Sequence, residues 1–474
     1  MIDTELLKEK VLDLAMRGKL VEQDPTEGNA RQLLEEIELE RERLIKEKKI
    51  KKSKPLPEIN KEEIPYEIPE SWEWVRVDEM MLVTMGQSPK KETINLDMNG
   101  YEFHQGKSLF ANKYIAMSDK YTTAANKVIC APAVVMSVRA PVGDVNLTDR
   151  NIFIGRGLAA FQTLGSTDIS YIYHYLSTIK KDLEKVSTGS TFKAINSTII
   201  RNIYIPLPPA KEQERIAGRI DHIFKLIDHL ADQQDKFINY QKLVQDKALE
   251  LAMQGKLVPQ IPEEGTAANL LEEVEAERQR LIDEKKIKKT KPLPEISEDE
   301  IPYDIPESWE WVRLGTIGDI VTGNTPPKKE LSYYGGKLPF VKPGDVLNNT
   351  INYNTEDYLT KEGATKARLA DKNDILITCI GNLGRSAIVK KQIAFNQQLN
   401  MIRPYPPIIE KFLKLAISSP GFILKLELEA SATTIKIINK SKLSNILIPL
   451  PPAEEQQRIS SKIDEINQVL YGEH

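Results

Sequence analysis

The sequence predicts a mixed α/β (α+β) fold in which two similar globular domains, related by pseudo-twofold symmetry, are separated by long antiparallel coiled-coil helices. Three observations support this fold class. The octet PESWEWVR at 69–76 recurs letter for letter at 306–313, and the two copies hold all four tryptophans. Residues 216–254 carry a heptad pattern of apolar side chains. The two ends of the chain match consecutive parts of that same helix, so the internal repeat is circular.

Residues 1–68 are expected to form spacer helices and a linker. Residues 1–15 match 238–252, and residues 10–76 align without gaps onto 247–313 with about 49 of 67 positions identical. The basic run at 46–54 and its twin at 284–291 favour a solvated linker, and contact with a DNA backbone is the alternative.

Residues 69–208 and 306–451 are expected to form the two globular domains. They resemble each other only in outline: GQSP at 86–89 answers GNTP at 323–326, and VVMSVRAPVGD at 134–144 answers ILITCIGNLGR at 375–385. The apolar framework is kept while the polar letters are exchanged, which indicates one scaffold with two different surfaces. For the repeated tryptophans, packing onto the domain core is favoured over base stacking or the docking of a partner.

Charge is unevenly distributed along the chain. Residues 77–205 contain 14 Lys and Arg against 11 Asp and Glu, and residues 314–448 contain 18 against 11, although the whole chain carries a net charge of −4. Local charge decides whether a surface attracts phosphates. Both domains are therefore candidates for a DNA-binding surface.

Residues 209–305 are expected to form a central helical spacer and a linker. Pro208 and Pro209 precede the long helix, as prolines do at a first turn. A second helix, from Ala267 to about Glu284, is expected to fold back on the first as a helical hairpin. Residues 452–474 are expected to form a C-terminal spacer helix, in which 453–474 match 210–231 and keep the heptad phase. We therefore expect the first and last helices to abut and to complete a second spacer.

Two spaced, similar but non-identical basic domains suit a bipartite DNA site. The predicted rod is on the order of 55–60 Å long, and B-DNA presents its major groove about every 34 Å. The two half-sites should differ in sequence, and the gap between them should be unread. A coiled-coil scaffold that binds no DNA is the alternative from another functional class.

Motifs for catalysis are not found. The five histidines show no metal-ligand spacing with the cysteines, and the sequence has no Walker loop, no GxGxxG and no GxSxG. Both cysteines, Cys130 and Cys379, lie in apolar runs and are predicted to be buried free thiols in a reducing compartment. No apolar run reaches the roughly 18 residues that a membrane helix needs.

The segments LPPA-EQ-RI, GKLV, LLEE-E-ER and EIPY-IPESWEWVR resemble those of the specificity subunit of type I restriction–modification enzymes. The resemblance spans the whole chain. It implies two target-recognition domains with twisted β-rich cores, each reading half of a split site in double-stranded DNA. It also implies helices that dock two methyltransferase (modification) subunits, with restriction/translocase subunits joining the complex in the cytoplasm. This chain would hold no cofactor, while S-adenosylmethionine, ATP and Mg²⁺ would bind to the partner subunits.

Candidate DNA-contact residues lie on turns and strand ends of both domains. Arginine can bond bidentately to guanine and glutamine to adenine, whereas lysine favours phosphate. The loops TGSTFK at 188–193 and SATTIK at 431–436 combine hydroxyls with a lysine, a composition that suits a DNA backbone. A surface position, a structural turn or a satisfied interior contact remains the alternative for each. The candidates are Gln105, Lys107, Arg139, Arg156, Thr191, Lys193, Lys342, Asn382, Arg385, Gln397, Thr434 and Lys436.

Overall fold

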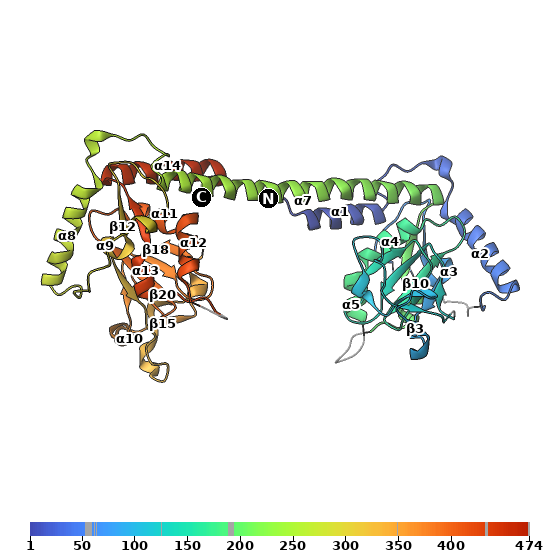
Figure 1. The fold of residues 1–474 in the computed structure, drawn as a ribbon. Coiled ribbons are helices and arrows are strands. Elements are labelled where there is room, and N and C mark those ends of the chain that lie inside the picture. The colour runs from blue at the N-terminus through green and yellow to red at the C-terminus, as the bar shows by residue number, and fades with distance from the viewer. Residues whose placement is uncertain are drawn as a thin grey trace. The chain divides into compact units, whose positions relative to one another are not determined.

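The computed structural model describes residues 1–52, 59, 60, 62, 64–124, 126–187, 194–347, 349–431 and 435–472 (Figure 1). The chain divides into two compact units, Met1–Asp235 and Lys236–His474. The long helix α7, Ala210–Met253, begins in the first unit and ends in the second. The two units are built to the same plan.

The first unit consists of two N-terminal helices, a β-rich domain that contains four short helices, and the first part of α7. Its helices are α1 Thr4–Met16, α2 Ala30–Lys46, α3 Val77–Met80, α4 Ile169–Thr178, α5 Lys180–Val186 and α6 Ser197–Arg201. Its strands are β1 Glu73–Arg76, β2 Met81–Met85, β3 Ile94–Asn95, β4 Tyr101–His104, β5 Tyr121–Thr122, β6 Val128–Ile129, β7 Ala133–Ser137, β8 Val145–Thr148, β9 Ile152–Ile154, β10 Leu158–Thr163 and β11 Tyr204–Leu207. We call 73–207 the first β-rich domain.

The second unit repeats this order. Its helices are α8 Ala267–Asp283, α9 Leu314–Ile317, α10 Lys361–Thr365, α11 Glu410–Ile417, α12 Pro420–Glu429, α13 Lys440–Asn445 and α14 Ala453–Tyr471. Its strands are β12 Glu310–Arg313, β13 Gly318–Thr322, β14 Tyr334–Val341, β15 Asp357–Leu359, β16 Leu369–Ala370, β17 Ile375–Thr378, β18 Ser386–Ile388, β19 Ile393–Phe395, β20 Leu399–Pro404 and β21 Leu447–Leu450. We call 310–450 the second β-rich domain.

Each β-rich domain contains two stacked sheets and a short strand pair. In the first domain the antiparallel sheet has the order β2-β10-β7-β8, and the mixed sheet has the order β3-β5-β4-β9-β6. In the second domain the corresponding orders are β13-β20-β17-β18 and β15-β14-β19-β16. The pairs β1-β11 and β12-β21 join the two ends of each domain. Within each mixed sheet, one pair runs parallel: β4 with β9, and β14 with β19.

The antiparallel sheet of the first domain lies between two cores, one shared with the helices and one shared with the mixed sheet. Every residue of β7 is buried. Val134 and Met136 belong to the core on the helix side, whereas Ala133 and Val135 belong to the core beneath the mixed sheet. Side chains on a strand alternate between its two faces, so an unbroken apolar run fills both cores. The apolar framework expected from the sequence is therefore the framework of these sheets.

Short helices pack antiparallel on α7 in each unit. In the first unit, Lys8 of α1 forms an ion pair with Asp228 (2.7 Å), and the Ile2 amide donates to Gln234 (2.8 Å). In the second, Gln245 of α7 donates to Asn467 of α14 (3.2 Å). The heptad seam is buried at Ile220 and Ile227, but Phe237 is 60% exposed and Val244 48% exposed. The expectation that α1 and α14 abut concerns both units at once and stays a prediction.

Two expectations were wrong. Helix α8 does not fold back along α7 as a hairpin; it runs down the side of the second β-rich domain (Figure 1). Its counterpart α2 shows why, because Glu40 accepts from the Gly165 amide (2.6 Å) and Arg41 donates to the Met81 carbonyl (3.3 Å). Cys130 is exposed, since its apolar run is split between two strands by a bend at 131–132; Cys379 is buried as expected.

The repeated octet forms the joint between each β-rich domain and its helices. Trp72 and Trp309 are each 3% exposed, which confirms that they pack in the core. Their indole N–H groups donate to Glu212 on α7 and to Glu455 on α14, both at 2.9 Å. Burial raises the pKa of both carboxyl groups despite these hydrogen bonds. Neither glutamate could be assigned to this joint from the sequence, because each lies more than 130 residues from its tryptophan.

Candidate nucleic-acid interface

In the first β-rich domain, parallel strands bring two chain segments to one edge. Strands β4 and β9 pair in parallel with His104 opposite Ile154, so the residues that follow both strands lie side by side. These are Gln105 and Gly155. In the antiparallel sheet, the end of β2 and the start of β10 also reach this edge, because Met85 lies opposite Ala159.

The loop GQSP locks onto this edge through its main chain. The Gly86 amide donates to the Leu158 carbonyl (2.9 Å), and the Gln87 amide donates to the Ile154 carbonyl (3.0 Å). A Cβ added to Gly86 would lie 2.1 Å from the Gly155 carbonyl oxygen. Glycine is therefore required for this close approach of two backbones.

Ser88 links two of the candidate residues. Arg156 donates from Nε to the Ser88 hydroxyl (3.2 Å), and Gln105 lies within hydrogen-bond distance of the same hydroxyl (3.3 Å). Both side chains are exposed. The structure thus brings together Gln105 and Arg156, which are 51 residues apart in the sequence (156 − 105).

The second β-rich domain has the same frame with different side chains. The Gly323 amide donates to the Leu399 carbonyl and the Asn324 amide to the Phe395 carbonyl, both at 3.1 Å. Thr325, at the place of Ser88, donates its hydroxyl to Gln397 Oε1 (2.6 Å). Gln397 is exposed and takes the place of Arg156.

A turn after the central strand presents Arg139. The Ser137 hydroxyl donates to the Pro141 carbonyl (2.9 Å) and accepts from the Asp144 amide (3.0 Å), which closes the turn. Arg139 is exposed on this turn, and its guanidinium has no partner among the described residues. It is therefore free to contact a ligand.

The corresponding turn of the second domain presents Asn382 and Arg385. The Thr378 hydroxyl donates to the Asn382 carbonyl (2.6 Å) and accepts from the Arg385 amide (3.0 Å). Both side chains are exposed and, within the part of the chain that the structure describes, unpaired. Arg385 occupies the position of Asp144, so the charge at this place is opposite in the two domains.

The loops and turns of each domain join into one continuous surface. The Val138 amide donates to the Gly157 carbonyl (2.9 Å) in the first domain, and the Cys379 amide donates to the Gln398 carbonyl (3.0 Å) in the second. We call this surface the interface edge. It comprises 86–89, 105–107, 138–144 and 155–157 in the first domain, and 323–326, 342–345, 379–385, 396–398 and 436 in the second.

The candidate lysines are held by carboxylates. In the first domain, Lys107 and Lys180 both pair with Asp144; burial opposes its ionisation, but the two ammonium groups hold the pKa of Asp144 below its ordinary value. Lys342 pairs with Glu356 (2.6 Å) and Asp357 (2.9 Å), which raise its pKa. An ammonium group has three N–H donors, so each lysine keeps at least one donor for a phosphate, while the paired carboxylates offset its positive charge.

Lys436 is also paired, with Glu427 at 3.1 Å, and the Gly381 amide donates to its carbonyl at 2.9 Å. The loop containing Lys436 therefore lies against the turn of Asn382 and Arg385. Three further candidates, Thr191, Lys193 and Thr434, lie outside the described residues.

Sequence reasoning missed the hydroxyls that organise this edge. Ser88, Thr325, Ser137 and Thr378 each fix a candidate side chain or turn through the hydrogen bonds given above. A signal was available, because both pairs occupy matched positions in the two domains and keep a hydroxyl at each. A hydroxyl shared at matched positions indicates a structural role, whereas the polar residues that differ between the domains indicate a different ligand.

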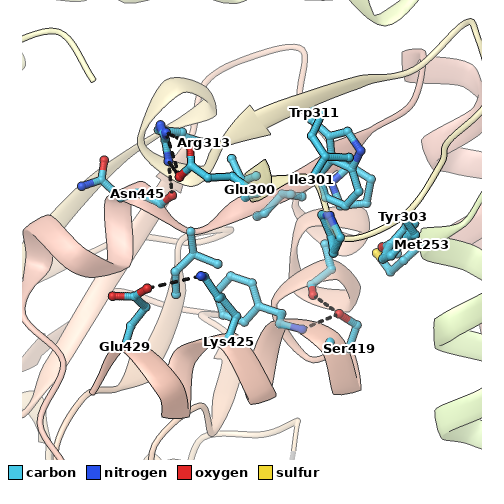
Figure 2. A pocket seen from close by; sticks show the side chains of 18 of the residues that line it. Met253, Glu300, Ile301, Tyr303, Trp311, Arg313, Ser419, Lys425, Glu429 and Asn445 are labelled. Atoms are coloured by element: carbon cyan, nitrogen blue, oxygen red, sulfur yellow. Dashed lines mark hydrogen bonds and ion pairs between the residues drawn. The ribbon is translucent and has the colours of Figure 1, made fainter. Parts of the chain in front are cut away.

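A cavity of about 670 Å³ lies elsewhere, at the joint of the second unit. Figure 2 shows two ion pairs in its lining: Arg313 with Glu300 (2.9 Å), and Lys425 with Glu429 (3.3 Å). Arg313 also donates to the Asn445 carbonyl (2.9 Å). The third lining cation, Lys442, donates to the Glu429 carbonyl (2.7 Å), so each described cation of the lining already has a hydrogen-bond acceptor.

No group of three or more His, Cys, Asp or Glu side chains in the described ranges is placed to hold a metal ion. Nor does any helix of the described part of the chain have the length and apolar character that a membrane span requires.

Comparisons with known proteins place this architecture in a family. The model of the type I restriction modification DNA specificity domain matches residues 69–238 and 306–470, more than half of the chain. The type I restriction enzyme EcoAI specificity subunit of Escherichia coli is 29% identical, over 98% of this chain and 88% of that protein.

Two solved structures share the fold. A chain from a study of complex assembly and conformational transition of the type I R-M system matches with a TM-score of 0.60 and 23% identity, covering 86% of this chain and 92% of that one. The HsdS subunit from Thermoanaerobacter tengcongensis matches with a TM-score of 0.52 and 21% identity, covering 86% and 91%. The chain belongs to the family of type I restriction–modification DNA specificity subunits.

Proposed function

We propose that this chain selects the DNA target of a type I complex by reading two separated half-sites, one with each interface edge. Residues 69–208 and 306–451 act as the two target-recognition domains. Residues 1–68, 209–305 and 452–474 supply the spacer helices and linkers. The chain itself performs recognition, and the chemistry is left to partner subunits that bind S-adenosylmethionine, ATP and Mg²⁺.

One observation carries this proposal: the same main-chain frame occurs twice and presents different side chains each time. Arg156 and Arg139 stand on the first interface edge, whereas Gln397, Asn382 and Arg385 stand on the second. Base edges are read by such planar or forked donors, while phosphates only fix the position of the protein. Two frames with two sets of donors suit a split, asymmetric site.

Docking of two modification subunits is supported by exposed apolar side chains on the rod of the second unit. Phe237, Tyr240 and Leu243 of α7 are 60%, 65% and 63% exposed, and Val469 of α14 is 86% exposed. Large apolar side chains exposed close together along a helix favour a protein interaction site. We propose that the modification subunits cover it and that the restriction/translocase subunits join that assembly.

Exchange of one domain tests the reading of half-sites. Residues 77–205 are replaced by those of another specificity subunit, the variant is produced with its modification subunits, and methylated adenines are mapped by single-molecule sequencing. One half of the methylated motif should change while the other half and the gap stay the same. The reciprocal exchange of 314–448 is the matched control and should change only the other half. A change in both halves from a single exchange contradicts modular reading.

The gap between the half-sites gives a second test. Helix α7 is continuous over 44 residues. Inserting one heptad into it adds about 10 Å of helix, which corresponds to about three base pairs of DNA. The unread gap of the methylated motif should lengthen accordingly, with both half-sites retained.

A further inference from the structure

The two interface edges place a hydroxyl and a planar side chain at matched positions. The hydroxyl belongs to the loop after β2 or β13, namely Ser88 or Thr325. The planar side chain belongs to the turn between β9 and β10 or between β19 and β20, namely Arg156 or Gln397. In both domains the hydroxyl is bonded to the planar group, at 3.2 Å and 2.6 Å respectively.

In the first domain, the hydroxyl uses only one nitrogen of the arginine. Arg156 donates from Nε to Ser88, which leaves both terminal nitrogens without a partner among the described residues. Two parallel N–H groups match O6 and N7 of guanine in the major groove. Because the guanidinium plane is already held, less conformational freedom is lost when the base binds.

In the second domain, the hydroxyl fixes the orientation of an amide. Thr325 donates to Gln397 Oε1, and Gln397 Nε2 has no partner in the described part of the chain. An amide oxygen has a second lone pair, so Oε1 can still accept from adenine N6 while Nε2 donates to N7. The fixed amide therefore suits adenine.

The neighbouring residues reinforce the difference. Gly155 leaves room for Gln105, because a Cβ there would lie 2.7 Å from Gln105 Oε1. The second domain has Asn396 at that position, which donates to Gln398 (3.0 Å), and Lys342 in place of Gln105 is tied to two carboxylates. Among the described residues, Gln397 is thus an exposed planar side chain of the equivalent cluster whose amide nitrogen is unpaired.

We propose that Arg156 reads a guanine in the half-site of the first domain, that Gln397 reads an adenine in the half-site of the second, and that Ser88 and Thr325 are positioning residues for them. This inference rests on the proposed function, because it assigns bases within the two half-sites. It goes beyond that function by naming one base and one reader for each domain.

The test uses the complex of the full chain with its modification subunits. The methylated motif of the unaltered complex is determined first. Methylation rates are then measured on duplexes that carry each single base-pair change in that motif. The variants are Arg156→Lys and Ser88→Ala in the first domain, and Gln397→Ala and Thr325→Ala in the second. All four positions are on the surface loops of the interface edge, and thermal unfolding checks that each variant is folded.

Arg156→Lys should reduce discrimination about 5- to 150-fold at one G·C pair of one half-site and leave the other half-site unchanged. Gln397→Ala should do the same at one A·T pair of the other half-site. Ser88→Ala and Thr325→Ala should reduce discrimination about 2- to 10-fold at those same pairs, because only the orientation is lost. Ser88→Thr and Thr325→Ser keep the hydroxyl and should restore discrimination.

The outcomes distinguish failure of the base assignments from failure of the proposed function. Unchanged discrimination at every position, with a bipartite motif intact, overturns the inference and leaves the proposed function standing. A loss at a pair of the other type overturns the base assignment. A motif that is not bipartite overturns the proposed function itself. If a variant methylates no duplex at all, binding of the same duplex panel to that complex decides between these outcomes.

Discussion

Trp309 donates its indole N–H to Glu455 Oε2 at 2.9 Å in the second unit, and Trp72 makes the same bond to Glu212 in the first. Each bond joins the start of a β-rich domain to a long helix, α7 in the first unit and α14 in the second. The second tryptophan of each octet, Trp74 or Trp311, instead packs edge-on against a tyrosine, with ring centroids 5.0 Å apart. Its buried indole nitrogen has no hydrogen-bond partner in the described structure.

Replacing Trp309 by Phe should therefore lower the free energy of unfolding of the second unit by about 1–3 kcal/mol, because a buried carboxyl group loses a donor. Denaturant unfolding of the full chain measures the change. Trp311→Phe is the matched control: it removes the same N–H from the same octet but breaks no hydrogen bond, so it should cost distinctly less. Equal losses for the two variants would show that packing, not the Glu455 bond, holds the joint.

Removing an unpaired guanidinium from the interface edge should weaken DNA binding. Arg139→Ala and Arg385→Ala should each lower the affinity of the assembled complex for its target, and a phosphate contact would also reduce the salt slope by about 1. Binding is measured over a range of salt concentrations. Lys372→Ala is the control, since this exposed lysine precedes β17 and Arg385 lies beyond its far end. If the three variants bind alike, the interface edge has been misplaced.

The contact between α4 and α7 in the first unit should lose stability in acid. The hydrogen bond from His174, together with that from Lys113, lowers the pKa of Asp221 from 3.8 to about 2. Because the folded-state pKa is depressed, the stabilisation is present above about pH 4 and is lost as the pH falls towards 2. Asp221→Asn should cost about 1 kcal/mol at neutral pH, a figure reduced for the partial exposure of the carboxylate.

The difference in stability between the original chain and Asp221→Asn should shrink as the pH falls below 4, as followed by unfolding at a series of pH values. Asp464 provides the control, since it lies at the equivalent place on α14 and, among the described residues, its one charged partner is the exposed Lys411, at 3.5 Å. Asp464→Asn should change stability little at any pH. A cost for Asp221→Asn that does not depend on pH would point to packing instead of charge.

The two cysteines should differ in reactivity. Burial raises the pKa of the Cys379 thiol to about 12, and Asn400 donates to its sulfur at 2.8 Å. Cys130 is exposed. A thiol reagent at neutral pH should label one site per folded chain and two per denatured chain, as read by mass spectrometry, because only the thiolate reacts readily. Labelling of folded Cys130→Ser would contradict the burial of Cys379.

The repeat and the buried strands could be predicted from the sequence because both depend on local pattern. The runs at 134–144 and 375–385 place β7, β17 and the turns that follow them, and the structure confirms both turns. The path of α8 could not be predicted, because its apolar face suits a β-rich domain as well as a rod. Cys130 was misjudged because a run of apolar letters does not show where a bend divides it.

The sequence identified the candidate DNA-contact residues one by one, but it did not show which of them lie close together in the fold. Gln105 meets Arg156 only because β4 and β9 run parallel, and strand direction is decided by contacts distant in the sequence. The ion pairs of Lys107 and Lys342 were likewise invisible, since their carboxylate partners come from other segments. Which of these residues contact bases stays a prediction.

The glycines of the two locking loops have a consequence for how such a protein acquires new targets. Gly86 and Gly323 hold their loops through amide-to-carbonyl bonds, so the shape of these two loops does not depend on the side chains of Gln87 or Asn324. Exposed side chains of the interface edge that make no structural hydrogen bond among the described residues, such as Arg139 and Asn382, can therefore be substituted while the main-chain frame is kept. Substitutions on the interface edge of one β-rich domain can therefore change the half-site that it reads, while the other domain keeps its own half-site.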